Sequence, residues 1–494
     1  MVAAAGGDEL IGEPEAARSG AGRPGSAAAS APAAEASGAE PRRIAIVGAG
    51  PAGLMAAELL ASAGHVVDIY DQMPSPARKL LMAGRGGLNL THSAPLDRFL
   101  RAYDPADPLL RRAVENFPPE RLIAWANGLG CETFVGSSGR VFPRAMKASP
   151  LLRAWLARLS GLGVTFHFRR RLTAIAPGPE LTFAVAQPGG TPRGEASRNV
   201  DGDKDERQSA VHANEVLAPD AVVLAMGGAS WPRLGSDGNW VGILERMGVR
   251  VAPLAAGNVA VAINWSEIMR ARHAGTPLKR IVVEAGGKRF PGEVVITATG
   301  LEGGPVYAAG RQIRTELAAG GEARIRIDLR PDLSLPALTE RLGTRKAKQS
   351  TATHLAKAGG LSRCAIALLR EAVLPDQLPE DAATLARLIK AVELRILGQA
   401  GLERAISTVG GVTFASLDQR FMLERIEGVF VAGEMLDWEA PTGGFLLQAT
   451  FATAVAAATA ADQWLNSKSP AASPTADADP HQPSRPGDAV LTRL

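Results

Sequence analysis

The fold is decided by residues 43–71, which read RIAIVGAGPAGLMAAELLASAGHVVDIYD. Residues 44–47 form a short apolar run without charge, as expected for a strand that is buried on both faces of a parallel sheet. A glycine-rich turn and a helical pattern follow, and residues 66–70 predict a second strand that ends at Asp71. This order predicts a strand–turn–helix–strand unit of a Rossmann-like α/β domain.

The turn itself carries the pattern GxGxxG, as Gly48, Ala49, Gly50, Pro51, Ala52 and Gly53. Gly48 permits a tight turn after the strand, and Gly50 lets the backbone approach a pyrophosphate. Gly53 allows the helix to pack closely on the sheet. Free N–H groups and the dipole of the first helical turn favour a bound phosphate. The turn therefore predicts a binding site for a dinucleotide.

An acid completes this unit. Asp71 follows the glycines at about the 20-residue spacing expected of a carboxylate that accepts the ribose hydroxyls, and Gln72 lies beside it. Glycine-rich turns are common, so GxGxxG alone is weak evidence. Two strands, a helix and the terminal acid favour a dinucleotide site over an ordinary βαβ turn. Up to this point the ligand is either FAD or NAD.

A second glycine-rich segment lies at residues 77–92, ARKLLMAGRGGLNLTH. It follows the ribose acid, which favours a loop whose backbone wraps around the ligand. Lys79 and Arg85 are candidate phosphate or substrate contacts, and Gly84 and Asn89 belong to the same loop. The alternative is that the two cations are solvated loop charges.

Two later segments resemble further parts of a cofactor site. An apolar strand at 221–225 leads to Gly227, although an ordinary strand-end turn explains that glycine equally well. A strand at 428–432 ends in Gly433 and Glu434, and an alanine-rich helix opens soon after. The positive end of that helix suits the negative charge of a reduced flavin, whereas the plainer reading is a structural C-terminal helix.

FAD is favoured over NAD because a nicotinamide dehydrogenase does not require the last of these segments. The residues expected to bind FAD are Gly48, Ala49, Gly50, Pro51, Ala52, Gly53, Asp71, Gln72, Lys79, Gly84, Arg85, Asn89, Gly227, Gly433, Glu434, Thr442, Gly443, Gly444, Phe445 and Leu446. No metal site is expected. No catalytic residue is assigned, since His92, Tyr103, His273 and Tyr307 are candidates by residue type only.

Composition limits the remaining classes of function. The chain has 494 residues, an apolar content of 46% and a formal charge of +4, and the surplus of Lys and Arg is taken to be spread out. Neither a nucleic-acid partner nor a membrane partner is therefore expected. Cys131 and Cys364 form no CxxC pair, which favours buried thiols in a reducing cytoplasm. The first 40 residues do not resemble a signal peptide.

Changes in composition and in the order of strand and helix patterns along the sequence predict an FAD-binding domain that is interrupted by an insert. The expected parts are a disordered tail (1–40), the first part of the FAD-binding domain (41–252, with a flexible loop at 189–209), an inserted cap domain of strands and helices (253–405), the second part of the FAD-binding domain (406–466) and a disordered tail (467–494).

Six motifs in this order resemble the BaiN-like family of FAD-dependent oxidoreductases, and in particular its branch of uncharacterised bacterial flavoproteins. They are GAGPAGLMAAELLASAG, KLLMAGRGGLNLTH, VVLAMGGASWPRLGSDG, TGLEGGPVY, STVGGVTF and VFVAGEMLDWEAPTGGFLLQATFATA, between about Arg42 and Ala461. The resemblance implies a glutathione-reductase-type FAD domain with an insert, and FAD contacts at 48–53, 71, 79–89, 433–434 and 442–446. Many relatives carry Arg-Cys-Asn where this chain has Gly87-Leu88-Asn89, so a cysteine-dependent role does not transfer.

The predicted function is an FAD-dependent oxidoreductase that passes a hydride through flavin N5, between NAD(P)H or an organic substrate and an unknown acceptor. No second GxGxxG follows a strand, so any NAD(P)H is expected to dock transiently as an electron donor. The alternatives are an RNA-associated flavoprotein and a flavin-binding sensor without turnover. The expected substrate is a small molecule, and the oligomeric state is left open.

Overall fold

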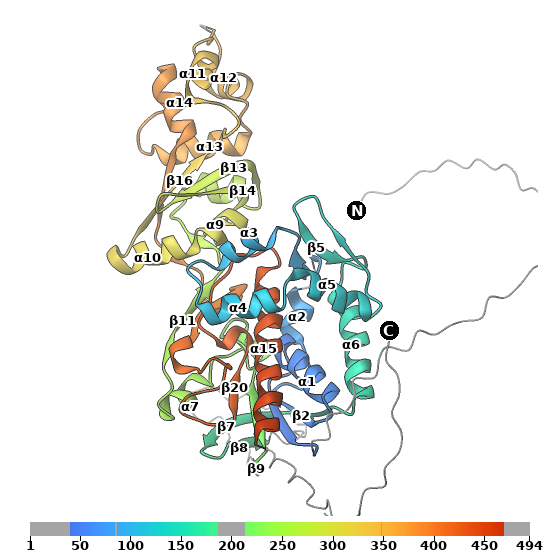
Figure 1. Ribbon diagram of the computed structural model, residues 1–494. Coiled ribbons are helices and arrows are strands. Elements are labelled where there is room, and N and C mark those ends of the chain that lie inside the picture. Colours follow the sequence, from blue (N-terminus) through green and yellow to red (C-terminus); the bar gives the residue numbers. More distant parts are fainter. Residues whose placement is uncertain (1–39, 84–85, 186–212, 347, 469–494) are drawn as a thin grey trace, which may run out of the picture. The chain divides into compact units, whose positions relative to one another are not determined.

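A computed structural model describes residues 40–83, 86–185, 213–346 and 348–468 (Figure 1). The compact unit that contains them begins at Ala39. The predicted loop at 189–209, Gly84, Arg85 and the predicted tails, apart from residues 40, 467 and 468, lie outside the described residues. The domain boundaries at 253 and 405 stay a prediction.

A five-stranded sheet in the order β20-β10-β1-β2-β6 forms the centre of the dinucleotide-binding fold predicted above. Its strands are β1 (Arg43–Val47), β2 (Val66–Asp71), β6 (Thr165–Phe168), β10 (Ala221–Leu224) and β20 (Val429–Val431). Every neighbouring pair runs parallel. The carboxyl ends of all five strands therefore meet at one edge, where doubly wound sheets bind their ligands. The predicted α/β fold is confirmed.

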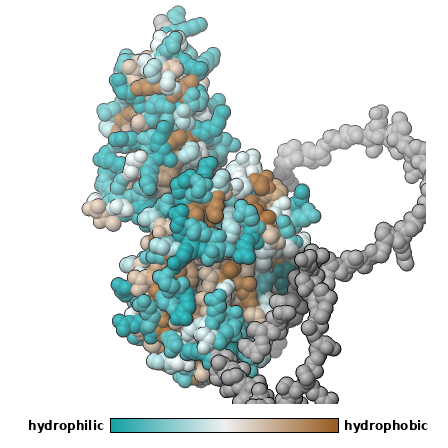
Figure 2. Space-filling model, viewed as in Figure 1, coloured by the Kyte–Doolittle hydropathy of each residue, from teal (hydrophilic) through white to brown (hydrophobic). Residues whose placement is uncertain are grey.

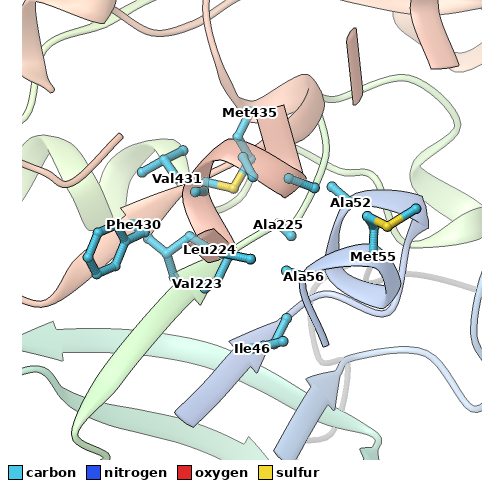
Figure 3. Close-up of a cluster of buried hydrophobic side chains, with 14 of the residues drawn as sticks. Ile46, Ala52, Met55, Ala56, Val223, Leu224, Ala225, Phe430, Val431 and Met435 are labelled. Atoms are coloured by element: carbon cyan, nitrogen blue, oxygen red, sulfur yellow. The ribbon is translucent and has the colours of Figure 1, made fainter. Parts of the chain in front are cut away.

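Helices cover this sheet and enclose an apolar core. They are α1 (Pro51–Ser62), α4 (Pro108–Asn116), α5 (Pro119–Gly128), α6 (Ala148–Gly161), α7 (Val241–Arg246) and α15 (Phe445–Ser467), with the shorter α2 (Arg78–Ala83), α3 (Leu96–Leu100) and η2 (Arg101–Tyr103). Ile46, Met55, Val223 and Phe430 pack in one cluster between sheet and helices (Figure 3). Residues 44–47 of β1 and all of β10 are apolar and buried, and the one charged residue of β1, Arg43, is exposed at its start.

Helix α15 is the one helix among the described residues that is long and apolar enough to cross a membrane. It packs on α1 and on α4. Of its most apolar window, 56% is buried inside the protein. Its apolar composition is therefore accounted for by packing within the core.

Three smaller sheets surround the parallel one. One contains β3 (Thr91–His92), β5 (Arg140–Pro143) and β4 (Thr133–Val135), and a second contains β7 (Arg170–Ala176), β8 (Glu180–Val185) and β9 (Ala213–Leu217). The third pairs β11 (Val251–Gly257) with β19 (Ser407–Val412). Single turns of 3-10 helix lie at η3 (Pro232–Leu234), η4 (Leu402–Arg404), η5 (Phe414–Ser416) and η6 (Gly433–Met435).

A seven-stranded sheet in the order β17-β16-β13-β14-β15-β12-β18 forms within the predicted insert. Its strands are β12 (Val261–Ala262), β13 (Pro277–Ala285), β14 (Lys288–Thr297), β15 (Gly300–Glu302), β16 (Ala323–Asp328), β17 (Val392–Ile396) and β18 (Gly398–Gln399). The helices are α8 (Glu267–His273), α9 (Gly304–Ala308), α10 (Gly310–Gly320), α11 (Leu335–Leu342), α12 (Thr351–Lys357), α13 (Arg363–Ala372) and α14 (Ala382–Lys390). Residues 261–396 supply a second apolar core.

The adjacent Gly286 and Gly287 predict a hairpin with a primed turn. This hairpin is confirmed, since β13 pairs with β14 and both glycines have positive φ. The glycines at 300–305 predict a loop that leads into a helix. This prediction is wrong in part, because Gly300–Glu302 is a strand. Leu301 pairs with Val261 of β12. A Cβ atom on Gly300 would lie 1.8 Å from the Val261 carbonyl oxygen, so glycine here permits the close pairing of two strands.

Candidate cofactor site

A cavity opens at the carboxyl edge of the parallel sheet, and we call it the first cavity. Its lining comes from the glycine turn and the ends of β1, β2 and β10, from α2 and from the loop after η3. The residue before β19 contributes Ile406, and the chain after β20 contributes Glu434, Trp438, Leu446, Leu447 and Thr450. Segments that lie far apart in the sequence thus meet at one site.

The glycine turn is built by two different requirements. Gly48 has φ +109°, and a Cβ there would lie 2.3 Å from the Ala225 carbonyl oxygen. A Cβ on Gly53 would lie 1.9 Å from the Gly48 carbonyl oxygen. At Gly50, in contrast, no atom lies within 4 Å of an added Cβ. Gly48 and Gly53 are therefore needed for packing, whereas Gly50 leaves open space beside the backbone.

The same turn leaves the start of α1 uncapped. Gly50 is the N-cap residue, and no side chain forms a capping hydrogen bond there. Pro51 occupies the first helical position, where its missing N–H group is no loss. The first amides of α1 are thus available to a phosphate at the positive end of the helix.

Asp71 is held against the turn at the end of β2. Its Oδ2 accepts a hydrogen bond of 2.7 Å from the Ala49 N–H, and its Oδ1 accepts one of 2.7 Å from the Met73 N–H. Burial raises the pKa of Asp71, while these two backbone hydrogen bonds and the Arg78 charge lower it. Each carboxylate oxygen keeps a second lone pair, which is the acceptor that a ribose hydroxyl needs.

Gln72 connects β2 to the loop that follows η3. Its Nε2 donates to the Gly235 carbonyl oxygen at 2.8 Å and to Asp237 Oδ2 at 3.2 Å. This loop lines the first cavity with residues 234–237, 239 and 240. The cofactor residues predicted from sequence did not include the loop, because its only signal was a motif within the family resemblance.

A polar network joins the separate segments. Lys79 Nζ donates to Ser230 Oγ at 2.5 Å and to Glu434 Oε2 at 2.6 Å. Glu434 Oε1 accepts from the Thr408 N–H at 2.9 Å. Thr408 Oγ1 in turn accepts from the amides of Ala229 and Ser230. Lys79, at the start of α2, is thereby fixed to β19 and to the residues that follow β10 and β20.

Two polar atoms in the wall of the first cavity lack a hydrogen-bond partner among the described residues. They are Ser236 Oγ and Arg78 Nε, and both are buried. A buried polar atom normally has a partner, so these two point to a polar ligand. Together with the open space at Gly50 and the uncapped start of α1, they fit a phosphate-containing dinucleotide such as FAD.

The predicted site residues divide into three groups. Those that line the first cavity are Gly48, Ala49, Gly50, Pro51, Ala52, Asp71, Gln72, Lys79, Gly227, Glu434 and Leu446. Those that do not are Gly53, Asn89, Gly433, Thr442, Gly443, Gly444 and Phe445. Gly84 and Arg85 lie outside the described residues. Contact of all three groups with FAD stays a prediction.

The start of α15 shows why several of these residues lie away from the cavity. Gly444 has φ +101°, and a Cβ there would lie 2.4 Å from the Thr91 carbonyl oxygen. The Phe445 ring stacks on His92 at a centroid distance of 5.4 Å. The start of α15 therefore packs against β3.

The four catalytic candidates chosen by residue type differ in their hydrogen bonds and in their position relative to the cavities. His92 uses both ring nitrogens, towards the Ser138 carbonyl and the Ala94 N–H, and burial lowers its pKa. Tyr103 donates to the Phe445 carbonyl at 2.7 Å, and burial raises its pKa well above the usual value. Neither His273 nor Tyr307 lines this cavity or the one described next.

A second cavity, of about 270 Å³, adjoins the first and shares Trp438 with it. It is lined by Tyr103, Pro105, Ala106, Asp107, Leu110, Arg311, Val409, Asp437, Trp438 and Glu439. Arg311 of α10 lies 3.2 Å from Glu439 and also donates to the Asp104 carbonyl oxygen. The Trp438 indole donates to the Gly433 carbonyl at 2.8 Å. The sequence at 435–441 predicts only a short loop and carries no signal of this cavity.

The parallel sheet and the first cavity at its carboxyl edge fit a protein that binds a dinucleotide. More narrowly, the chain belongs to the HI0933-like family, because the model of the HI0933-like protein Rossmann domain matches residues 42–460. It is an FAD-dependent oxidoreductase of this family, and the resemblance to the BaiN-like flavoproteins is confirmed.

Curated relatives carry two kinds of name. A 3-dehydro-bile acid delta(4,6)-reductase from Clostridium scindens is 25% identical over 85% of this chain and 98% of that protein. A ribosomal RNA dihydrouridine synthase from Escherichia coli is 26% identical over 84% of this chain and 96% of that protein. Among solved structures, a 3-ketosteroid-delta4-(5alpha)-dehydrogenase from Rhodococcus jostii is 14% identical, with a TM-score of 0.45 over 87% of this chain and 99% of that one.

Proposed function

We propose that this protein transfers a hydride through N5 of an FAD held in the first cavity. The observation that carries the proposal is the continuous lining from the glycine turn to Glu434 and Trp438. The turn and Asp71 would hold the pyrophosphate and ribose, and Lys79 and Glu434 would approach the flavin end. The bound flavin supplies hydride chemistry, while the protein supplies its position and polarity.

We further propose that the acceptor is a carbon–carbon double bond conjugated to a carbonyl group. The names of both relatives describe saturation of such a bond: the delta(4,6) bonds of a 3-oxo steroid, and the 5,6 bond of uridine. A conjugated carbonyl stabilises the negative charge that develops when a hydride adds to the far carbon. A small molecule of this class, reduced in the cytoplasm, is our first candidate substrate, and the free thiols of Cys131 and Cys364 suit that compartment.

The electron donor gives the first test. We expect NADPH or NADH, added without oxygen to the purified yellow protein, to bleach the flavin band near roughly 450 nm. Subsequent addition of a conjugated enone, such as 2-cyclohexen-1-one, should restore the band. A protein that cannot take up FAD would contradict the proposal, and a flavin that neither accepts nor returns electrons would favour the sensor.

An RNA substrate is a second candidate, and a specific charge cluster favours it. Seven cations lie between residues 341 and 370, a stretch without Asp or Glu: Arg341, Arg345, Lys346, Lys348, Lys357, Arg363 and Arg370. All seven are exposed, and none forms an ion pair within the described part of the chain. The surface over α11 and α12 is mostly hydrophilic (Figure 2). The expectation that the surplus of Lys and Arg is spread along the chain is therefore wrong for residues 341–370.

Salt dependence tests this candidate. If the cluster binds a phosphate backbone, replacing Arg345, Lys346 and Lys348 by Ala should weaken binding of a labelled ribosomal RNA hairpin about tenfold at low salt. The slope of log K against log salt should also fall by about 2–3. Fluorescence anisotropy measures both quantities.

The matched control removes three cations that already have carboxylate partners. Arg324 and Arg326 pair with Glu393, and Arg395 pairs with Glu322. Their replacement by Ala should leave the slope nearly unchanged. An equal loss in both triple variants, or no binding by the unaltered protein, would remove the RNA candidate and leave the small molecule.

A further inference from the structure

The second cavity lies where a substrate of the proposed reaction would meet the flavin end of the first. The two cavities share the buried Trp438, whose neighbour Asp437 lines only the second. Glu434, three residues earlier, lines the first. One short segment of chain therefore borders both spaces. The volume of about 270 Å³ is close to the roughly 300 Å³ at which small-ligand sites begin.

Asp437 is the acid in this cavity whose carboxylate is free. Its backbone N–H is bound to the Val412 carbonyl, but its carboxylate has no hydrogen bond or ion pair within the described residues. Two residues later, Glu439 is held by both Arg311 and Arg314 of α10. Asp107 is engaged as well, because it caps the start of α4 through the Leu109 N–H. The polar residues around Asp437 are thus fixed.

The surroundings of Asp437 shift its pKa above the ordinary value for Asp. Partial desolvation at the cavity wall raises its pKa, the Arg311 charge lowers it, and the nearby Glu439 charge raises it further. Tyr103 and Asp107 are the other titratable groups that line the cavity. Tyr103 keeps its proton in the bond to the Phe445 carbonyl, so it is not available as a donor. Asp437 itself remains solvent-exposed, so water can return a proton to its carboxylate.

We infer that Asp437 is the residue that delivers the proton which completes reduction of the double bond. The inference rests on the proposed function. Hydride addition to the carbon far from the carbonyl breaks the π bond and leaves an electron pair on the near carbon. That pair forms the new C–H bond with the Asp437 proton. The O–H bond breaks, its electrons stay on the carboxylate, and water restores the proton.

The inference can be tested without any net redox reaction, because proton transfer at the near carbon is reversible. In D₂O, the oxidised FAD-loaded protein should exchange the α-hydrogens of cyclohexanone, the saturated analogue of 2-cyclohexen-1-one. NMR follows this exchange. The rate should rise with pH as the Asp437 carboxylate forms, with a midpoint above the ordinary value for Asp. Asp437→Asn should lower the rate about 100-fold and abolish this rise.

Asp104→Asn is the matched control, since Asp104 is exposed, lies near the cavity and does not line it. It should exchange like the unaltered protein. Bleaching of the flavin by NAD(P)H should be the same in all three proteins, so failure of the redox proposal is seen separately. Absence of exchange in the unaltered protein would overturn the role of Asp437. So would an equal rate in Asp437→Asn with flavin still bound.

Discussion

Gly48→Ala is expected to yield a protein that neither folds stably nor binds FAD. The substitution places a methyl group 2.3 Å from the Ala225 carbonyl oxygen, at a residue with φ +109°. An L side chain in that conformation costs about 1–2 kcal/mol, and forced overpacking adds about 1–3 kcal/mol. The sum, about 2–5 kcal/mol, is a large part of the stability of a typical domain. Thermal unfolding of the apoprotein and flavin absorbance measure the two losses.

Gly50→Ala is the control that separates packing from ligand binding. Its φ of −82° suits alanine, and no atom lies within 4 Å of the added methyl group. The apoprotein should therefore unfold within about 1 kcal/mol of the unaltered one. FAD should nevertheless bind at least about tenfold more weakly, because the methyl group occupies the space that a pyrophosphate would approach. Tight FAD binding by this variant would show that the pyrophosphate lies elsewhere.

Lys79→Met is expected to weaken FAD binding by about 10–100-fold, the worth of one hydrogen bond to a charged group. It also leaves Glu434 without its cation, beside the first cavity. The two side chains are 26% and 17% exposed, so solvent screens the remaining charge in part. We expect a loss of about 1–2 kcal/mol in apoprotein stability. Titration with FAD, followed by flavin fluorescence, gives the affinity.

A double-mutant cycle provides the control for Lys79. Glu434→Gln keeps an oxygen for the Thr408 N–H and removes the charge. The double variant, Lys79→Met with Glu434→Gln, should be more stable than the two single losses predict, because no unpaired charge remains. Strict additivity would mean that the ion pair contributes nothing. Unchanged FAD affinity in Lys79→Met would place the lysine outside the cofactor site.

Local sequence patterns were sufficient to predict the strand–turn–helix–strand unit of the parallel sheet. The run at 44–47, the glycine turn and Asp71 are close in sequence, and each has one conformational reason for its residue types. The hairpin around Gly286 is of the same kind. Such features depend on periodicity and turn chemistry, which neighbouring residues determine, so they can be predicted without knowledge of the tertiary structure.

The parts of the candidate site that sequence patterns did not predict depend on contacts between residues that lie far apart in the chain. The cavity role of Ser236 follows from the loop that Gln72 holds, and the two lie more than 160 residues apart. The second cavity requires Arg311 and Asp437 to meet, and neither residue carries a local signal of that meeting. The start of α15 is the reverse case: its glycines resemble a ligand site, yet Gly444 is explained by the close approach of Thr91.

Because β20 lies late in the sequence, the parallel sheet cannot be completed until long after its other strands have been synthesised. Val429 pairs with Val222, so the partner of β10 leaves the ribosome about 200 residues later, some 10–40 seconds at ~5–20 residues per second. Until then the edge of β10 is bare, and bare strand edges attract other chains. Glu434, Leu446 and Thr450 arrive later still. A nascent chain thus has the glycine turn long before it has the far wall, so the first cavity can be complete only after residue 450 has been made.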